Sequence, residues 1–540
     1  MTPDLERYLD DTDAELVRQI RSAADASDYD TALRLTERRL VRPIDLSAPA
    51  GRLLKAELAA WLIDIGNESQ RGESIRRGLS ILEDDREVLI ENVHPASYEY
   101  NLGNGYSSLF FIDQHQPGFR LRPSALDHVL KAKNHYWNAF RFVRSHDETL
   151  RRQLWVNLAN CLRQCNRAPE AIRYYDEVLR EDPSFAQANL NRAAALIQLN
   201  ELSDTFTANQ LFQAMKGYVA AGSTNALTQP MREYSNARSE ALRQRLLQLG
   251  YDPERLAHDS SETAEEYDRH SEYRRFCIQS HLCLSEHSLY CGCVGARRDD
   301  LTIPKSTAPI GGEFVPRLEF ILNRLKSEFA FARLLYYQGA VLQVPEWKIY
   351  EEELRLTELF ENELIGPRAE MLRLSFRNCF GVLDKIAMGV CELFSFSDPQ
   401  ETLYFESFWR PRGRRLSEAQ ARRWERINET NNASLVALYS QATDLNPATG
   451  DWPEFKAWRN ALEHRVLCVR QAATGRSDPH SVLRPNDGDV VVPAGEFRKR
   501  ALFLLRLTHS AIMSFAFCVR EEGAKHAGKG GSRITLDGRS

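Results

Sequence analysis

The chain has 540 residues, of which 43% are hydrophobic and 27% are charged. This composition provides enough apolar surface for large cores and excludes wholesale disorder. The length corresponds to about three or four domains. The formal net charge of -5 excludes a globally basic nucleic-acid binder, so any site for RNA has to be a local basic patch.

The first residues of the chain, Met1–Glu6, are acidic and lack an apolar run. We therefore expect no signal peptide. Ten cysteines in a chain without such a signal indicate reduced thiols and no disulfide framework. The sequence thus predicts a cytoplasmic protein with no membrane attachment.

Helical periodicity dominates the chain. Apolar residues at three- and four-residue spacing predict helices from the start, over residues 13–24, 29–40 and 53–65. Alternating runs typical of strands are scarce, and the best of them is the short run Val490–Val492. The pattern predicts an all-α fold.

The N-terminal half contains a pattern that resembles a tetratricopeptide repeat, a pair of antiparallel helices about 34 residues long. The residues that carry it are Trp155, Leu158, Ala159, Leu162, Ala171, Tyr175, Val178 and Pro183. The small residues allow the two helices to approach closely, and the proline ends the second helix. We predict a repeat domain over residues 1–259, which either binds an unknown protein partner or only positions the rest of the chain.

An irregular connector is predicted over residues 260–317, where His, Cys, Gly and Pro interrupt the helical pattern. Zinc accepts thiolate and imidazole ligands, and a helix would place Cys277 with His281, and Cys283 with His287, on one face. No paired C-x2-C motif supports a metal site, so we predict packed thiols, no metal and no cofactor, with a zinc module as a third hypothesis. The residues concerned are Cys277, His281, Cys283, His287, Cys291 and Cys293.

Helical periodicity resumes at Leu318, which predicts a second helical domain over residues 318–522. The longest apolar segment, Ala501–Val519, is interrupted by polar residues. We predict a buried bundle helix there, because a membrane span needs about 20 predominantly apolar residues. Residues 523–540 are rich in Gly, Lys and Ser and are predicted to form a disordered tail.

A dense run of arginines lies inside this second domain, between Trp409 and Arg426. Guanidinium groups bind phosphates, and aromatic rings stack on bases, so the run can bind RNA. The alternative is a solvated loop and helix start without a ligand. The predicted RNA-binding residues are Arg410, Arg412, Arg414, Arg415, Arg422 and Arg423.

The strongest functional signal is the segment Arg459–His464, which reads Arg-Asn-Ala-Leu-Glu-His. A helix is predicted to begin near Pro453, because proline is favoured in the first turn. On that helix Asn460 and His464 are four residues apart and share one face. Arg459 and His464 are separated by about 140°, at roughly 100° per residue, so a long arginine side chain could still converge with the imidazole.

The segment resembles the R-x4-6-H motif of HEPN domains, and the residues before it are similar to a bacterial HEPN subfamily that is fused to tetratricopeptide repeats. The order of these segments, more than the short motif, carries the resemblance, which covers residues 318–519 well. The matching segments are Phe376–Asn378, Leu383–Ala387, Glu392–Phe394, Ser407–Trp409, Leu435–Leu445 and Leu462–His464.

The resemblance implies an up-and-down helical bundle that forms a homodimer, with two copies of the motif in one cleft. Many members of the family are metal-independent endoribonucleases of toxin, antiphage or RNA-processing systems. RNA carries its own nucleophile, the 2'-hydroxyl. His464 would then exchange protons, Arg459 would stabilise the charged phosphorane, and Asn460 would orient the imidazole or the substrate.

Two questions stay open at the level of sequence. Glu463 either favours the protonated form of the neighbouring His464 or pairs with Arg459 and supports the helix. The whole protein is predicted to be a homodimeric endoribonuclease of a toxin or antiphage system, whose repeats receive a trigger. The alternative is a non-catalytic adaptor that binds protein or RNA partners.

Overall fold

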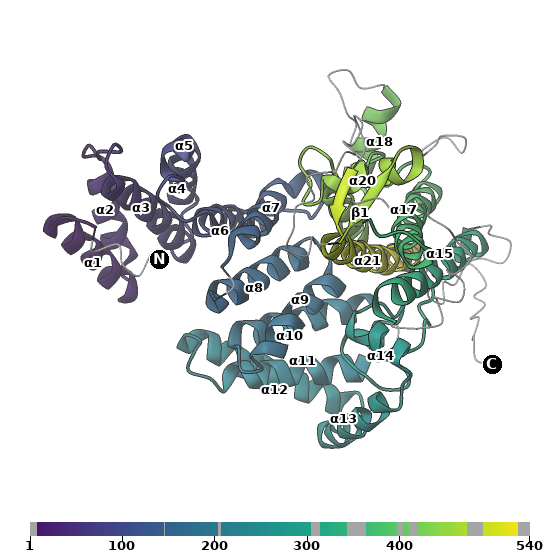
Figure 1. The fold of residues 1–540 in the computed structure, drawn as a ribbon. Coiled ribbons are helices and arrows are strands. Elements are labelled where there is room, and N and C mark those ends of the chain that lie inside the picture. Colours follow the sequence, from purple (N-terminus) through teal and green to yellow (C-terminus); the bar gives the residue numbers. More distant parts are fainter. Residues whose placement is uncertain are drawn as a thin grey trace. The chain divides into compact units, whose positions relative to one another are not determined.

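The computed structural model shows helices almost throughout the part of the chain that it describes (Figure 1). Two short strands form the sole sheet in that part, so the predicted all-α fold class is confirmed. The chain forms two compact units, Met1–Cys165 and Asn166–Ser540. The described residues are 8–144, 146–203, 207–303, 314–342, 363–396, 403–409, 418–471 and 490–526.

The first unit is built from helices that follow one another closely along the chain. Apolar residues on α1, α2 and α3 form one core, which includes Val17, Leu33 and Trp61. The side chains of Asp10 and Asp28 accept hydrogen bonds from N–H groups in the first turns of α1 and α2, which explains where these helices begin. The elements are α1 (Asp11–Asp25), α2 (Tyr29–Leu40), α3 (Pro49–Glu68), α4 (Gly72–Asp84), α5 (Arg86–Leu89), α6 (Pro95–Gln114), η2 (Pro123–Ala125), α7 (Asp127–Phe142) and α8 (Glu148–Gln164).

The second unit begins with four helices, each of which packs against the next. They are α9 (Ala168–Glu181), α10 (Ala186–Leu202), α11 (Thr207–Gly222) and α12 (Gln229–Gln248). Six of the eight positions that carry the repeat pattern are buried in α8 or α9: Leu158, Ala159, Leu162, Ala171, Tyr175 and Val178. The boundary between the two units falls between these two helices. The tetratricopeptide assignment and the domain limits at residues 259 and 317 therefore stay predictions.

The connector predicted to be irregular contains regular structure. Helix α13 (Pro253–Asp268) extends into it, and α14 (Glu272–Gln279) lies within it. Asp252 and Ser271 accept hydrogen bonds from the first turns of these helices, and such capping signals are short enough to be missed in a loop-like composition.

Helix α14 ends at Gln279, and His281 follows with a left-handed φ of 53°. No helix therefore places Cys277 with His281, or Cys283 with His287, on one face, and that part of the zinc hypothesis is wrong. Cys277 and Cys283 instead pack with Ile278 in a small apolar cluster. A short 3-10 helix, η3 (Glu286–Leu289), comes next in the chain.

The C-terminal part of the second unit is a bundle around one long helix, α21, which packs against α15, α17 and α19 and also against α9 (Figure 1). By length and composition alone α21 could cross a membrane, but 83% of its apolar window is buried inside the protein, as expected of a core helix. It continues through Gly523 to His526, so the first residues of the predicted tail are helical, and residues 527–540 lie outside the described part. The elements are α15 (Phe314–Tyr336), the π-helical turn η4 (Tyr337–Val341), α17 (Pro367–Phe394), α18 (Glu418–Glu429), α19 (Ala433–Asp444), α20 (Glu454–His464), β1 (Leu467–Arg470), β2 (Val490–Pro493) and α21 (Ala494–His526).

The two strands lie at the end of α20 and the start of α21. They pair in parallel, with Leu467 opposite Val490 and Arg470 opposite Pro493. The best strand-like run of the sequence, Val490–Val492, therefore lies in a strand. The pairing fixes the point at which the chain leaves α20, directly after His464.

A buried ionic network joins α9 to the bundle. The Arg167 guanidinium lies 2.7 Å from the carboxylates of both Glu170 and Asp444, and all three side chains are almost fully buried. Gln441 donates to Glu170 at 3.0 Å and to Ser510 of α21 at 3.0 Å. Because a buried charge is costly unless it is paired, these contacts define how α9 and α19 meet.

Candidate active site

The predicted motif lies on α20, which begins after Pro453 as the sequence indicates. The inner face of this helix contributes Phe455, Trp458 and Ala461 to the core. Asn460 and His464 are both exposed and lie one turn apart, so they form part of the outer face. The structure therefore presents the amide and the imidazole together to solvent at the C-terminal end of the helix.

Arg459 points to the neighbouring helix α17 and is held there in three ways. Its Nη2 lies 3.0 Å from Oδ2 of Asp384. Its guanidinium carbon is 5.1 Å from the ring centre of Phe380 and 5.5 Å from that of Tyr404, distances at which the faces of aromatic rings attract cations. The side chain is 20% exposed, so its position is fixed without full loss of contact with solvent.

A second ion pair joins the same two helices. Nε of Arg377 on α17 lies 3.3 Å from Oε1 of Glu463 on α20. Arg377 precedes Asp384 on α17 by two turns, whereas its partner Glu463 follows Arg459 on α20 by one turn. The two helices are therefore antiparallel at this contact. In one ion pair α17 supplies the cation, and in the other it supplies the anion. Neither expected role of Glu463 describes this contact, because its partner is Arg377 and not Arg459 or His464.

Asp384 connects the motif to the segment that follows α17. Its Oδ1 accepts a hydrogen bond from the backbone N–H of Phe405 at 2.9 Å, and its Oδ2 faces Arg459. Burial raises the pKa of Asp384, and this effect outweighs the Phe405 N–H and the Arg459 guanidinium, which favour the carboxylate. Next to Phe405, Glu406 pairs with Lys456 of α20 at 3.1 Å. The segment is therefore fastened to both helices of the site.

The predicted arginine patch is only partly within the described residues. Arg410, Arg412, Arg414 and Arg415 lie outside them. Arg422 is exposed on α18, 3.8 Å from Glu418. Arg423 is buried, and its guanidinium donates to the carbonyl oxygen of Phe408 at 3.4 Å. RNA binding by these residues stays a prediction.

Sequence reasoning alone had assigned no role to Arg377, Phe380, Asp384 or Tyr404. Arg377 and Asp384 lie in segments that carry the family resemblance, which gives them no role of their own. The signal that could have found them is spacing: positions 377, 380 and 384 fall on one face of a helix. The partners of that face could not be identified, because Asp384 and Arg459 are 75 positions apart in the sequence.

The class of the domain is shown by comparison with known protein families. A helical bundle forms around α21, and its helix α20 carries the Arg-Asn-x3-His segment, with Arg459 paired to Asp384 of α17. Residues 311–522 match the family described as LA2681-like HEPN. The chain thus carries a HEPN domain at its C-terminal end, behind a helical N-terminal region. No curated protein and no solved structure matched the chain.

Proposed function

We propose that the protein is a metal-independent endoribonuclease that cleaves RNA through its own 2'-hydroxyl. The observation that supports this best is the pairing of an exposed Asn460 and His464 with an arginine, Arg459, held in place by Asp384 and two aromatic rings. Preorganised cationic groups stabilise a developing negative charge without reorganisation during the reaction. The HEPN family match agrees with a ribonuclease or a nucleotide-related function.

The proposed reaction needs two proton transfers. The 2'-oxygen loses its proton to a base and forms a bond to phosphorus, while the bond from phosphorus to the 5'-oxygen breaks and that oxygen takes a proton from an acid. The products are a 2',3'-cyclic phosphate and a 5'-hydroxyl. Two copies of His464 in a homodimer would supply the base and the acid, Arg459 would face the phosphorane, and Asn460 would orient one of the reacting groups.

The direct test is cleavage of single-stranded RNA by the purified full-length protein, in magnesium-free buffer with EDTA. We expect cleavage by the wild type and a loss of at least about a hundredfold in His464→Ala and Arg459→Ala. His146→Ala is the matched control, because His146 is also exposed but lies outside the HEPN domain. Equal cleavage by all four proteins would show that Arg459 and His464 do not form the active site. Products without a cyclic phosphate would rule out attack by the 2'-hydroxyl.

The biological setting that we propose is a toxin or antiphage system in the cytoplasm, with the helical N-terminal region receiving a protein trigger. Expression of the wild type in a bacterial host is expected to slow growth, and expression of His464→Ala is not. If both proteins slow growth equally, the growth effect is not caused by RNA cleavage at His464.

A second candidate function is a non-catalytic adaptor. It is favoured by one observation: Arg459 and Glu463 both take part in ion pairs between α17 and α20 and therefore also brace the bundle. If the motif serves only this purpose, Arg459→Ala lowers the melting temperature while His464→Ala changes neither stability nor any RNA-dependent property.

A further inference from the structure

Three metal-ligating side chains converge in the connector that precedes the HEPN bundle. They belong to His287, Cys291 and Cys293, and their ligand atoms all lie within 4.8 Å of one another. Nε2 of His287 is 3.0 Å from Sγ of Cys293. His287 is buried, whereas the two cysteines are half-buried, so the cluster has one buried wall and remains open to an incoming ion.

The backbone around the cluster is arranged by local hydrogen bonds. The N–H of Cys291 donates to the carbonyl oxygen of His287 at 3.1 Å, which folds the chain back directly after η3. The N–H of Ala296 donates to the carbonyl oxygen of Cys293 at 3.1 Å. A Cβ atom at Gly295 would lie 3.4 Å from Sγ of Cys293 and 3.5 Å from the His287 ring. The backbone therefore closely borders the cluster on this side.

The other three of the six candidate ligands named from the sequence do not belong to this group. Cys277 and Cys283 pack together with Ile278 in a separate apolar cluster. His281 lies 3.8 Å from a carboxylate oxygen of Asp176. The six residues that the sequence places close together are thus divided by the fold, and three of them share a space suitable for one ion.

We propose that His287, Cys291 and Cys293 bind one Zn²⁺ ion, with a water molecule or an external ligand in the fourth position. Zinc prefers thiolate and imidazole ligands in a tetrahedron, with bonds of about 2.3 Å to sulfur and about 2.0–2.1 Å to nitrogen. Ligand atoms around such an ion are about 3.6 Å apart. The ligand atoms lie within 4.8 Å of one another, so their largest separation has to shorten by at most about 1.2 Å to reach that geometry. Binding releases the protons of the two thiols.

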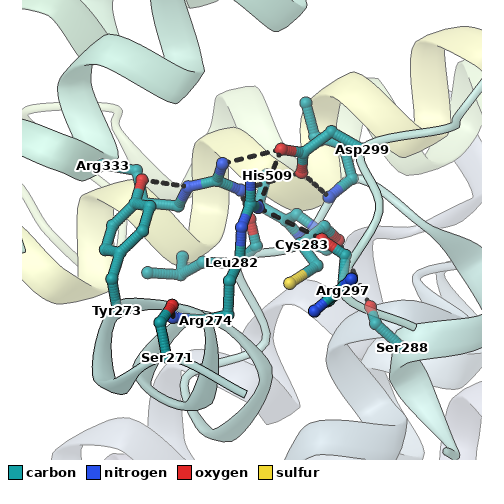
Figure 2. A network of polar contacts seen from close by, with 11 residues as sticks. Ser271, Tyr273, Arg274, Leu282, Cys283, Ser288, Arg297, Asp299, Arg333 and His509 are labelled. Atoms are coloured by element: carbon teal, nitrogen blue, oxygen red, sulfur yellow. Dashed lines mark hydrogen bonds and ion pairs between the residues drawn. The ribbon is translucent and has the colours of Figure 1, made fainter. Parts of the chain in front are cut away.

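The ion would stabilise a segment that is docked on the HEPN bundle (Figure 2). Both carboxylate oxygens of Asp299 accept hydrogen bonds from Arg333 of α15, at 2.9 and 2.7 Å. Before the cluster in the chain, the carbonyl oxygen of Cys283 accepts a hydrogen bond from His509 of α21 at 2.8 Å. The proposed ion links residues that lie between these two anchors in the chain, so its loss is expected to loosen the connector.

Metal content tests the proposal on the full-length protein. After expression with zinc in the medium and removal of loose ions by gel filtration, we expect about one zinc ion per wild-type chain and less than about a tenth of an ion in Cys291→Ser and Cys293→Ser. Cys468→Ser is the matched control, since Cys468 is a half-buried cysteine on β1, and it should retain its zinc. Equal zinc content in all four proteins means adventitious binding and overturns the proposal.

Cobalt spectroscopy tests the ligands without any variant. Co²⁺ added to the zinc-depleted wild type should give the sulfur-to-cobalt charge-transfer band and the strong visible bands of a tetrahedral site, and one equivalent of Zn²⁺ should remove them. A spectrum without the sulfur band excludes thiolate ligands and overturns the site. This outcome is decisive even if the serine variants fail to fold.

The thermal stability of the protein reports the structural consequence. Removing zinc with a strong chelator should lower the melting temperature of the wild type, and re-adding Zn²⁺ alone should restore it, with no change in Cys293→Ser. RNA cleavage below the melting temperature should persist in Cys293→Ser, because the proposed cleavage does not use this ion. Failure of the zinc proposal and failure of the ribonuclease proposal are therefore separate results.

Discussion

Arg459 combines two requirements that usually conflict. A guanidinium that stabilises a phosphorane has to be accessible, yet a flexible side chain loses entropy when it is ordered. The Arg459 guanidinium is already ordered before substrate binds, because Asp384, Phe380 and Tyr404 all contact it. Asp384 is therefore a positioning residue in the proposed site.

Asp384→Asn should lower the rate of RNA cleavage about tenfold, because an amide keeps the contact with the Phe405 N–H but loses the charge that holds Arg459. In the wild type, protonation of Asp384 should reduce cleavage as the pH falls through its raised pKa, and the variant should lack this acid limb. The pH profile of kcat measures both effects.

Arg377→Gln is the matched control for this prediction. It removes the other ion pair between α17 and α20, which is more exposed and is worth about 0–1 kcal/mol. It should leave the acid limb in place. An acid limb that survives in Asp384→Asn would show that a different group controls it.

His509 makes the stability of the bundle dependent on pH. Burial lowers the pKa of His509 to about 4, and the nearby Arg173 and Arg333 act in the same direction. The unfolded chain takes up a proton at this position below about pH 6.5. Stability from this residue is therefore complete above that pH and decreases as the pH falls toward about 4.

His509→Gln should reduce the loss of unfolding free energy between pH 7 and pH 5 by about 2 kcal/mol. Denaturant titrations at the two pH values measure the difference, and His146→Gln, at an exposed histidine, should behave as the wild type does. If His509→Gln and the wild type lose the same unfolding free energy between pH 7 and pH 5, the pH dependence does not come from His509.

At the level of elements, the close approach of α17 and α21 depends on one glycine. A Cβ atom at Gly389 would lie 2.7 Å from two ring atoms of Phe515, which is fully buried. At Gly381, on the same helix, the nearest atom to such a Cβ is the Lys385 Nζ at 3.9 Å. The same substitution should therefore have opposite effects at the two positions.

Gly389→Ala should lower the unfolding free energy by about 1–3 kcal/mol through overpacking, whereas Gly381→Ala should raise it by up to about 1 kcal/mol through helix propensity. Melting temperatures of the two variants measure this. Stabilisation in both would mean that Phe515 yields easily and that the helices are not in close contact there.

The elements were predicted better than their contacts. Periodicity located α20 and α21, and the valine run located β2, because these signals come from neighbouring residues. Helices α13 and α14 were missed within a segment whose Cys, His and Gly content is typical of loops. Their start signals are single capping residues, Asp252 and Ser271, which carry little weight in a loop-like composition.

At the level of the whole molecule, the proposed chemistry requires two motifs in one cleft and therefore a homodimer. Sedimentation of the full-length protein should give a dimer. A tenfold excess of His464→Ala over wild type should reduce wild-type activity to about a tenth, since most wild-type chains then pair with an inactive one. An equal excess of albumin is the control.

Activity that is unaffected by the excess variant would show that each chain works alone. If the protein sediments as a monomer at all concentrations, only one His464 is present in the active site. Another residue would then have to supply the acid or the base. Under either outcome, the role of Arg459 can still be tested by Arg459→Ala.

The all-α class and the resemblance to HEPN domains can be read from the sequence, because they depend on local spacing and on the order of segments along the chain. The same holds for the position of the Arg-Asn-x3-His segment near the end of a helix. The contacts of the motif residues, Asp384 with Arg459 and Arg377 with Glu463, are visible only in the folded chain. The same is true of the cluster that unites three of the six candidate ligands of the connector. Such contacts join positions that local periodicity cannot relate. They form when packed helices and folded loops bring distant side chains together, and buried charges then require partners.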